Sequence, residues 1–256
     1  MTDLVLADFT SPGPRDFVFP AIAGVNGFTK PIVLAALSVV VIVGFFLYAM
    51  RKPALVPGKL QFLAETGYGL VRNSIARDSI GPEFRKYVPY LVSIFFFILV
   101  NNIFGLFPLT VFPTMSRVAF PMALAIVTWV LFLSIGISRR GFVGYFKSML
   151  FPPGVPAYIY PLLAPLEFLS NVIVRPITLS LRLFANMFAG HLLLLVFVLG
   201  GEYLLEQEGP VRFVGPLSWL FVLALSFLEL LIEVLQAYIF TVLSALYIAG
   251  SIADEH

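Results

Sequence analysis

The chain alternates between long stretches without charged residues and short charged segments. Residues 31–50, 87–116 and 118–138 contain no Asp, Glu, Lys or Arg. A helix of about 20 apolar residues crosses the roughly 30 Å hydrocarbon core of a bilayer. The pattern therefore predicts a first membrane span at 31–50 and a transmembrane hairpin at 87–138.

Two later apolar runs, 166–205 and 216–253, are each about 40 residues long. As helices they would measure about 60 Å, twice what a perpendicular crossing needs, so we expect them to be tilted or bent. The prolines within 151–166 predict that no continuous helix runs through that stretch, and we expect a cytoplasmic or interfacial loop at 139–165. The predicted fold class is an all-α polytopic membrane protein with about five membrane-crossing helices, the last two forming a long hairpin.

The charged segments predict the topology. Residues 1–30 are mixed and read as an external N-terminal arm, not as a signal peptide. Segment 51–86 has more Lys and Arg than Asp and Glu, and its apolar residues recur at helical spacing, which predicts a surface helix at 59–80. By the positive-inside rule this loop and 139–165 are cytoplasmic. The N-terminus is then outside and the C-terminus cytoplasmic, within a single integral membrane domain over 1–256.

Composition excludes several function classes. The chain is 60% hydrophobic and 12% charged, its formal net charge is only +2, and Lys and Arg lie mainly in loops, so nucleic acid is not an expected partner. With no Cys and two His, disulfides and thiolate chemistry are excluded, and a zinc site with several ligands is not expected. No phosphate-binding loop of the GxxxxGK[ST] type is present. We expect no cofactor, no metal and no catalysis by this chain itself.

Polar residues inside the first long run follow one stripe. An arginine in the middle of a membrane helix costs about 2.5–3.5 kcal/mol on insertion scales, which makes Arg182 the first functional candidate. Small residues on this helix would let another helix approach closely, although packing by hydrogen bonds is the plain alternative for such polar groups. The stripe, at intervals of 4, 4, 3, 4 and 4 residues, consists of Glu167, Asn171, Arg175, Thr178, Arg182 and Asn186.

His191 lies about half a turn away from Arg182 and should face the other long helix. There Glu229, Glu233 and Gln236 share one face. A lone membrane histidine more often serves packing, but opposite two carboxylates it favours proton transfer. If this outer set and a cytoplasmic set at Glu167 open to opposite sides, a permanent cation between them would block a direct leak.

The chain resembles subunit a of the F-type ATP synthases in three motifs, LRLFANMFAGH at 181–191, NNIFGLFP at 101–108 and LELLIEVLQAYIFTVLSALYIAG at 228–250. The resemblance implies a static proton-channel subunit with two half-channels beside a rotating c-ring. The two long helices would then form a nearly horizontal hairpin against that ring. The implied partners are the c-ring, b-type peripheral-stalk subunits, the lipid bilayer and protons.

The resemblance also implies roles for single residues. Arg182 would be the essential arginine facing the ring carboxylate. The residues implied beside it or facing the ring are Asn186, Gln236, Arg175 and Thr178; those implied in the outer half-channel are His191, Glu229, Glu233 and Asn102; those implied in the cytoplasmic half-channel are Glu167, Asn171 and Ser170. In the family the cytoplasmic carboxylate is often one residue further along, where this chain has Phe168.

Two other classes of protein are weighed against this interpretation. A secondary proton-coupled transporter would use broken helices and internal repeats, and none is visible. A membrane scaffold would leave the intramembrane charges without a purpose. The sequence leaves H⁺ or Na⁺ open, although a histidine and glutamate relay favours H⁺. The basic loops favour a bacterial plasma membrane.

Overall fold

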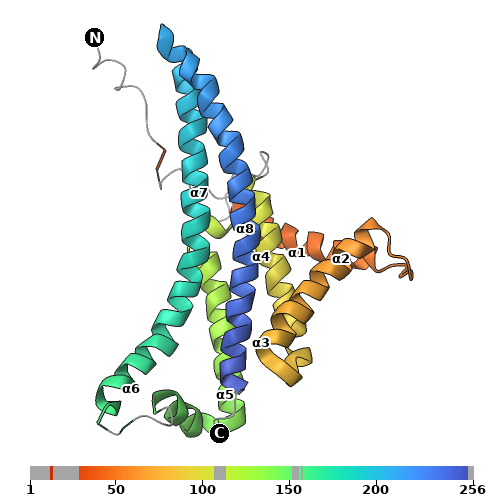
Figure 1. The fold of residues 1–256 in the computed structure, drawn as a ribbon, viewed down its shortest axis with the longest axis vertical. Helices are drawn as coiled ribbons and strands as arrows, with labels where there is room; N and C mark the ends of the chain where they lie inside the picture. Colours follow the sequence, from red (N-terminus) through yellow and green to blue (C-terminus); the bar gives the residue numbers. More distant parts are fainter. Residues whose placement is uncertain (1–11, 14–28, 107–113, 152–155, 157, 253–256) are drawn as a thin grey trace. The chain divides into compact units, whose positions relative to one another are not determined.

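The computed structural model describes residues 12–13, 29–106, 114–151, 156 and 158–252, and within these every regular element is a helix. Among the described residues, five helical segments are long and apolar enough to cross a membrane, which confirms the predicted fold class. The expected N-terminal arm, the end of the 101–108 motif and the last four residues lie mainly or wholly outside the described residues. The α-helices in Figure 1 are α1 (Lys30–Ala49), α2 (Lys59–Gly69), α3 (Asp78–Ile80), α4 (Val88–Leu106), α5 (Ala119–Leu150), α6 (Tyr160–Phe168), α7 (Arg175–Glu206) and α8 (Val214–Ile252).

The first span and the surface helix occur where the sequence predicted helices. Helix α1 matches the predicted span at 31–50. The predicted helix at 59–80 consists of α2, a π-helical segment Leu70–Arg77 and α3. Val71 and Ile75, one turn apart, are fully buried, whereas Arg72 and Arg77 are exposed. The segment is therefore amphipathic, as its apolar spacing predicted.

The prediction of a loop at 139–165 is wrong for residues 139–150, which are helical. Helix α5 continues to Leu150, and the chain folds back inside it at Gly141, which has φ +70° and ψ +165°. This left-handed backbone suits glycine, because a Cβ would be strained there. Beyond the bend Tyr145 packs onto Gly136, where a Cβ would lie only 2.1 Å from the tyrosine ring. A helical continuation thus lies where the basic residues predicted a loop.

No continuous helix runs through 151–166 in the described residues, as the prolines predicted, but the end of this stretch is helical from Tyr160 onward. Pro161 lies in the first turn of α6, where the missing N–H would have had no partner. Pro165 lies inside the helix and removes one donor, which neighbouring turns tolerate. From Tyr160 to Glu206 the chain stays helical through a π-helical segment, Leu169–Val174. Pro176 follows this segment and cannot donate to a carbonyl one turn back, which accounts for the widened turn.

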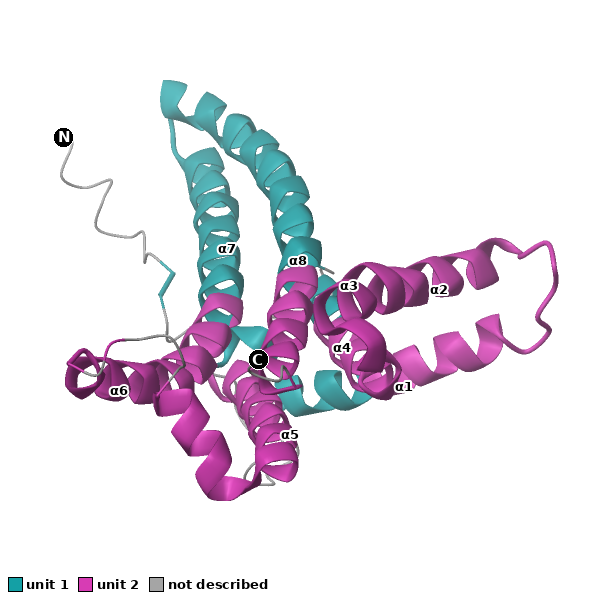
Figure 2. Cartoon of the chain, turned by 60° about the horizontal axis from the view of Figure 1, so that its bottom comes forward, with its two compact units in different colours: residues 1–38, 99–117, 184–236 teal, residues 39–98, 118–183, 237–256 magenta. Residues whose placement is uncertain are grey.

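The described chain forms two compact units, coloured separately in Figure 2. Unit 1 contains residues 1–38, 99–117 and 184–236. Within it the second part of α7 and the first part of α8 run side by side (Figures 1 and 2). Small residues permit this approach, since a Cβ on Gly201 would lie 2.7 Å from the Trp219 ring.

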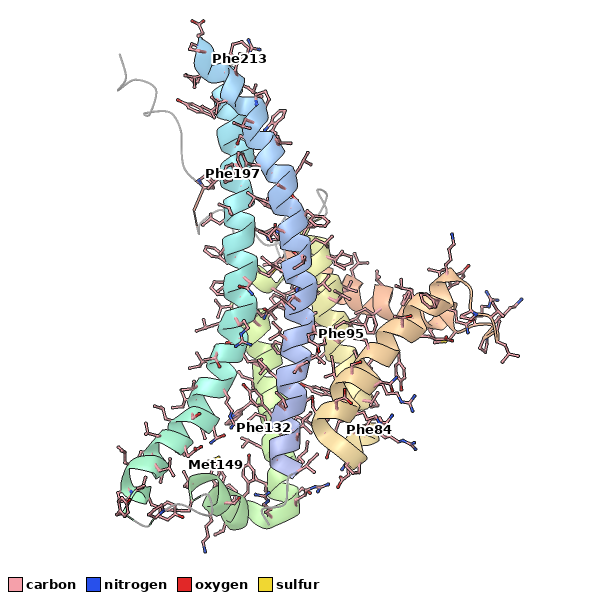
Figure 3. The ribbon with its side chains drawn as sticks, in the orientation of Figure 1. Phe84, Phe95, Phe132, Met149, Phe197 and Phe213 are labelled. Carbon is pink, nitrogen blue, oxygen red and sulfur yellow. The ribbon has the colours of Figure 1, made fainter. Side chains whose placement is uncertain are left out.

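Unit 2 contains residues 39–98, 118–183 and 237–256. Its core includes Phe132, labelled in Figure 3, whose ring centroid lies 5.6 Å from that of Tyr247 on α8. The Tyr90 hydroxyl on α4 shares a 2.7 Å hydrogen bond with Thr128 on α5. Aromatic packing and a satisfied hydrogen bond therefore hold the helices of this unit together.

Candidate functional site

A buried histidine lies at the centre of unit 1. His191 on α7 is only 4% exposed. Its Nδ1 lies 2.6 Å from Glu229 Oε1 on α8 and 3.1 Å from the Met187 carbonyl oxygen. Its Nε2 lies 3.1 Å from the carbonyl oxygen of Gly105 on α4. Both ring nitrogens thus face oxygen atoms, and a protonated ring could donate from both while a neutral ring donates from one.

Glu229 approaches the histidine because the residue before His191 has no side chain. A Cβ on Gly190 would lie 2.6 Å from Glu229 Oε1 and 3.1 Å from its Cδ. Real Cβ atoms do not show such contacts, so the carboxylate uses the space that glycine leaves. Gly190 was not among the predicted site residues, although it directly precedes the histidine in the sequence.

Glu233 lies one turn beyond Glu229 and is 2% exposed. Among the described residues its carboxylate oxygens have no hydrogen-bond partner, and those of Glu229 have none of good geometry. Asn102 on α4 donates from Nδ2 to the backbone carbonyl of Glu233 over 3.1 Å. The structure thus brings together all four residues expected for the outer half-channel, His191, Glu229, Glu233 and Asn102.

Three of these residues, Asn102, Glu229 and Glu233, line a cavity of about 80 Å³ in unit 1. A volume of 10–15 Å³ holds one water molecule, so there is room for several. Leucine and isoleucine side chains form much of its wall, and five polar residues also line it. These five are Asn102, Asn186, Glu229, Glu233 and Gln236.

Asn186 and Gln236 form the polar contact at one end of this cavity. Asn186 Nδ2 donates to Gln236 Oε1 over 2.9 Å. Gln236 is buried, whereas Asn186 is exposed. Two residues expected near the essential arginine therefore contact each other across α7 and α8.

Arg182 lies on α7 in unit 2 and is exposed, as is Thr178 one turn earlier. The Thr178 hydroxyl donates back to the Val174 carbonyl over 2.8 Å, a bond that satisfies it within its own helix. The expected position of Gln236 beside Arg182 stays a prediction.

Unit 2 contains a second polar cavity, of about 180 Å³. Asn171 donates from Nδ2 to Glu167 Oε2 over 2.9 Å, and the Arg175 guanidinium lies 5.1 Å from the Tyr247 ring centroid. These three stripe residues therefore meet in one place, whereas Ser170 does not line the cavity. The cavity is lined by Arg140, Tyr145, Ser148, Met149, Glu167, Asn171, Arg175, Gly250 and Ser251.

Several of these lining residues were not predicted. Arg140 donates to the Ser148 hydroxyl over 2.8 Å, across the bend at Gly141. The sequence analysis used Arg140 only as a sign of the cytoplasmic side, because the bend that returns Ser148 toward it is not visible in an apolar pattern. Ser251, near the end of α8, carried no signal of its own.

Taken together, the apolar helices and the buried charged groups define a polytopic membrane protein with polar sites inside its helical bundle. The model of the ATP synthase A chain family matches residues 32–249. The chain therefore belongs to this family, the membrane-sector subunit of the F-type ATP synthase. The resemblance found from the three motifs is confirmed.

Several relatives called ATP synthase subunit a match over nearly the whole chain. One from a Nocardioides species is 53% identical over 97% of this chain and 95% of its own length. Another from Pseudarthrobacter chlorophenolicus is 49% identical over 97% and 96%. A third, from Streptomyces lividans, is 42% identical over 97% and 89%. Membership of the ATP synthase complex and a role in ATP synthesis and proton transport follow for this multi-pass membrane protein.

Proposed function

We propose that this chain is the non-catalytic, proton-conducting stator of the synthase, with two offset half-channels that serve the carboxylates of a rotating c-ring. The observation that carries the proposal is the buried contact of His191 with Glu229, 2.6 Å between Nδ1 and Oε1, beside Glu233 and a cavity of about 80 Å³. Buried ionisable groups in membrane helices are costly and are kept where they move ions.

The outer half-channel consists of His191, Glu229 and Glu233, with Asn102 holding the backbone of Glu233. A proton that reaches this cluster can pass between carboxylate and imidazole without a large movement, because the two groups are already in contact. Imidazole and carboxylate groups exchange protons readily near neutral pH. Asn186 and Gln236, at the same cavity, lead from the cluster toward the ring.

Arg182 separates the two pathways. Its guanidinium stays charged at any physiological pH, so it repels a proton in a medium of low dielectric constant. A proton must then travel on the ring carboxylate and leave by the cytoplasmic half-channel at Glu167 and Asn171, where Arg175 also lines the cavity. One elementary charge crossing 100 mV releases about 2.3 kcal/mol, which biases the rotation.

The topology belongs to the same proposal. The N-terminus lies outside and the C-terminus in the cytoplasm of a bacterial plasma membrane, and b-type peripheral-stalk subunits hold this chain against rotation. The supporting observation is the distribution of charge, with basic residues at 51–86 and 139–147 and acidic residues at 202–208.

The test is ATP synthesis driven by an imposed pH gradient and potential in vesicles that contain the whole complex. We expect Arg182→Ala to abolish synthesis and Glu229→Gln to slow proton uptake, with Glu233→Gln having a smaller effect. Arg212→Ala and Glu202→Gln are matched controls, because both residues are exposed near the turn between α7 and α8. Immunoblots confirm equal assembly.

Undiminished synthesis in Arg182→Ala would contradict the stator proposal. The transporter and scaffold hypotheses would then have to be considered again. Synthesis that needs Na⁺ in the medium would contradict the choice of ion.

A further inference from the structure

We infer that His191, Glu229 and Glu233 form a binding site for a divalent transition-metal ion, for which Zn²⁺ is the best probe. Each residue offers one ligand atom, and these atoms lie within 4.8 Å of one another. That the bound ion would inhibit the synthase rests on the proposed half-channel, but the binding itself does not.

The separations of these atoms suit a zinc ion. Zinc takes imidazole nitrogen and carboxylate oxygen ligands at about 2.0–2.2 Å, which places tetrahedral ligands about 3.4 Å apart. His191 Nδ1 and Glu229 Oε1 are now 2.6 Å apart, and the widest separation in the cluster is under 4.8 Å. Side-chain rotations alone can bring all three to that spacing.

The histidine is already held as a metal ligand would be. Metal-binding histidines usually donate their second ring N–H to a backbone carbonyl or carboxylate, which fixes the ring. Nε2 of His191 lies 3.1 Å from the Gly105 carbonyl oxygen, so this nitrogen can carry the proton. Nδ1 then faces only oxygen atoms, those of Glu229 and Met187, and its lone pair is available to a metal cation placed between it and the carboxylate.

Charge and burial favour the same conclusion. Glu233 is 2% exposed and the Glu229 side chain 7%, and among the described residues neither carboxylate has a hydrogen bond. Two ionised carboxylates would carry a charge of −2 in a buried site, and a divalent cation cancels it. The adjoining cavity of about 80 Å³ leaves space for water as a fourth ligand.

The choice of metal follows from the ligands. Imidazole suits Zn²⁺, Cu²⁺, Fe²⁺ and Ni²⁺ better than Mg²⁺ or Ca²⁺, which prefer oxygen alone. The sequence analysis counted only Cys and His when it set zinc aside, and two of the three ligands here are carboxylates from α8. A metal held by these groups would occupy the atoms that pass protons.

The experiment measures zinc directly. Native complex and the His191→Gln and Glu233→Gln variants are incubated with Zn²⁺, desalted and assayed for bound metal, with Glu202→Gln as the matched control because Glu202 is exposed on the same helix as His191. We expect one equivalent that the control keeps and both site variants bind at least about tenfold more weakly. Equal binding in native and His191→Gln complexes overturns the inference.

A second measurement covers variants that fail to assemble. X-ray absorption at the zinc edge of the native complex should show nitrogen and oxygen ligands with a single imidazole; sulfur ligands or several imidazoles overturn the inference. Zn²⁺ added to native vesicles should inhibit proton-driven ATP synthesis, and a chelator should restore it. Zinc bound at this site without inhibition would leave the metal site standing and contradict the proposed half-channel instead.

Discussion

Asn186 Nδ2 donates a 2.9 Å hydrogen bond to Gln236 Oε1, and this contact joins α7 to α8 at the wall of the unit 1 cavity. Gln236 is 3% exposed, so few other partners are open to its amide oxygen. The contact therefore fixes two amide groups that the proposed pathway needs between the proton relay and the ring.

Replacing Asn186 by Ala should destabilise this contact. It leaves the buried oxygen of Gln236 without a donor, which costs about 1–3 kcal/mol. Gln236→Leu alone should cost less, because the partner left behind is exposed. The measurement is thermal stability of the complex for both single variants and the double variant. Additive effects would show that the two residues do not interact.

Gly190→Ala should impair proton uptake. The new Cβ would lie 2.6 Å from Glu229 Oε1 and would push the carboxylate away from His191. Overpacking of this kind typically costs about 1–3 kcal/mol. Gly200→Ala is the matched control, since no atom lies within 4 Å of a Cβ there. Proton pumping by assembled complexes is the measurement, and equal rates for the two variants would contradict the role of Gly190.

Gly141→Ala should destabilise the bend in α5. Gly141 has φ +70°, and an alanine there is strained by about 1–2 kcal/mol. Gly144→Ala is the control, because its Cβ would meet only an ordinary contact at 3.6 Å. We expect a lower melting temperature for the first variant, together with weaker protection of residues 141–150 from proteolysis. A melting temperature that matches the control would contradict this account.

The ion pair between Glu83 and Arg139 predicts a pH dependence. The hydrogen bond from Arg139 lowers the pKa of Glu83 from its ordinary value of 4.5. The pair therefore contributes stability above the ordinary pKa, and that stability is lost as the pH falls through the lowered pKa. Because Glu83 is exposed, we expect a small, salt-sensitive effect.

Melting temperatures at pH 7 and pH 3 test this relationship. The difference between native and Glu83→Gln complexes should be present at pH 7 and smaller at pH 3, below the ordinary pKa of 4.5. Arg139→Gln should remove the same pH-dependent part. A difference that persists unchanged at pH 3 would show that Glu83 acts through packing and not through its charge.

The sequence predicted the spans well because runs without charge are a direct consequence of the bilayer. It did not predict the helices at 139–150 and 160–165, for two physical reasons. A positive φ at Gly141 leaves no mark in an apolar pattern, and prolines in the first turn of a helix look the same as prolines that break one.

The candidate site likewise contains features that the sequence predicted and others that it did not. His191 and Glu229 were predicted to face each other because helix periodicity fixes which side chains share a face. Gly190 was not predicted because it acts through the absence of a side chain, and Gly105 was not predicted because it acts through its backbone carbonyl. Arg140 was missed since its cavity depends on the bend at Gly141.

The π-helical segment Leu169–Val174 changes the direction in which the residues before it face, relative to the residues after it. A π-bulge corresponds to one extra residue in an otherwise α-helical chain. Counting back from Arg182, the widened turn therefore places Glu167 close to where a regular helix would place residue 168. The position of the carboxylate in this chain, one residue earlier than is common in the family, and the widened turn compensate for each other. Deleting one residue within Leu169–Val174 would give a regular α-helix and leave Glu167 facing its cavity, whereas a regular helix without that deletion would turn Glu167 by about 100°.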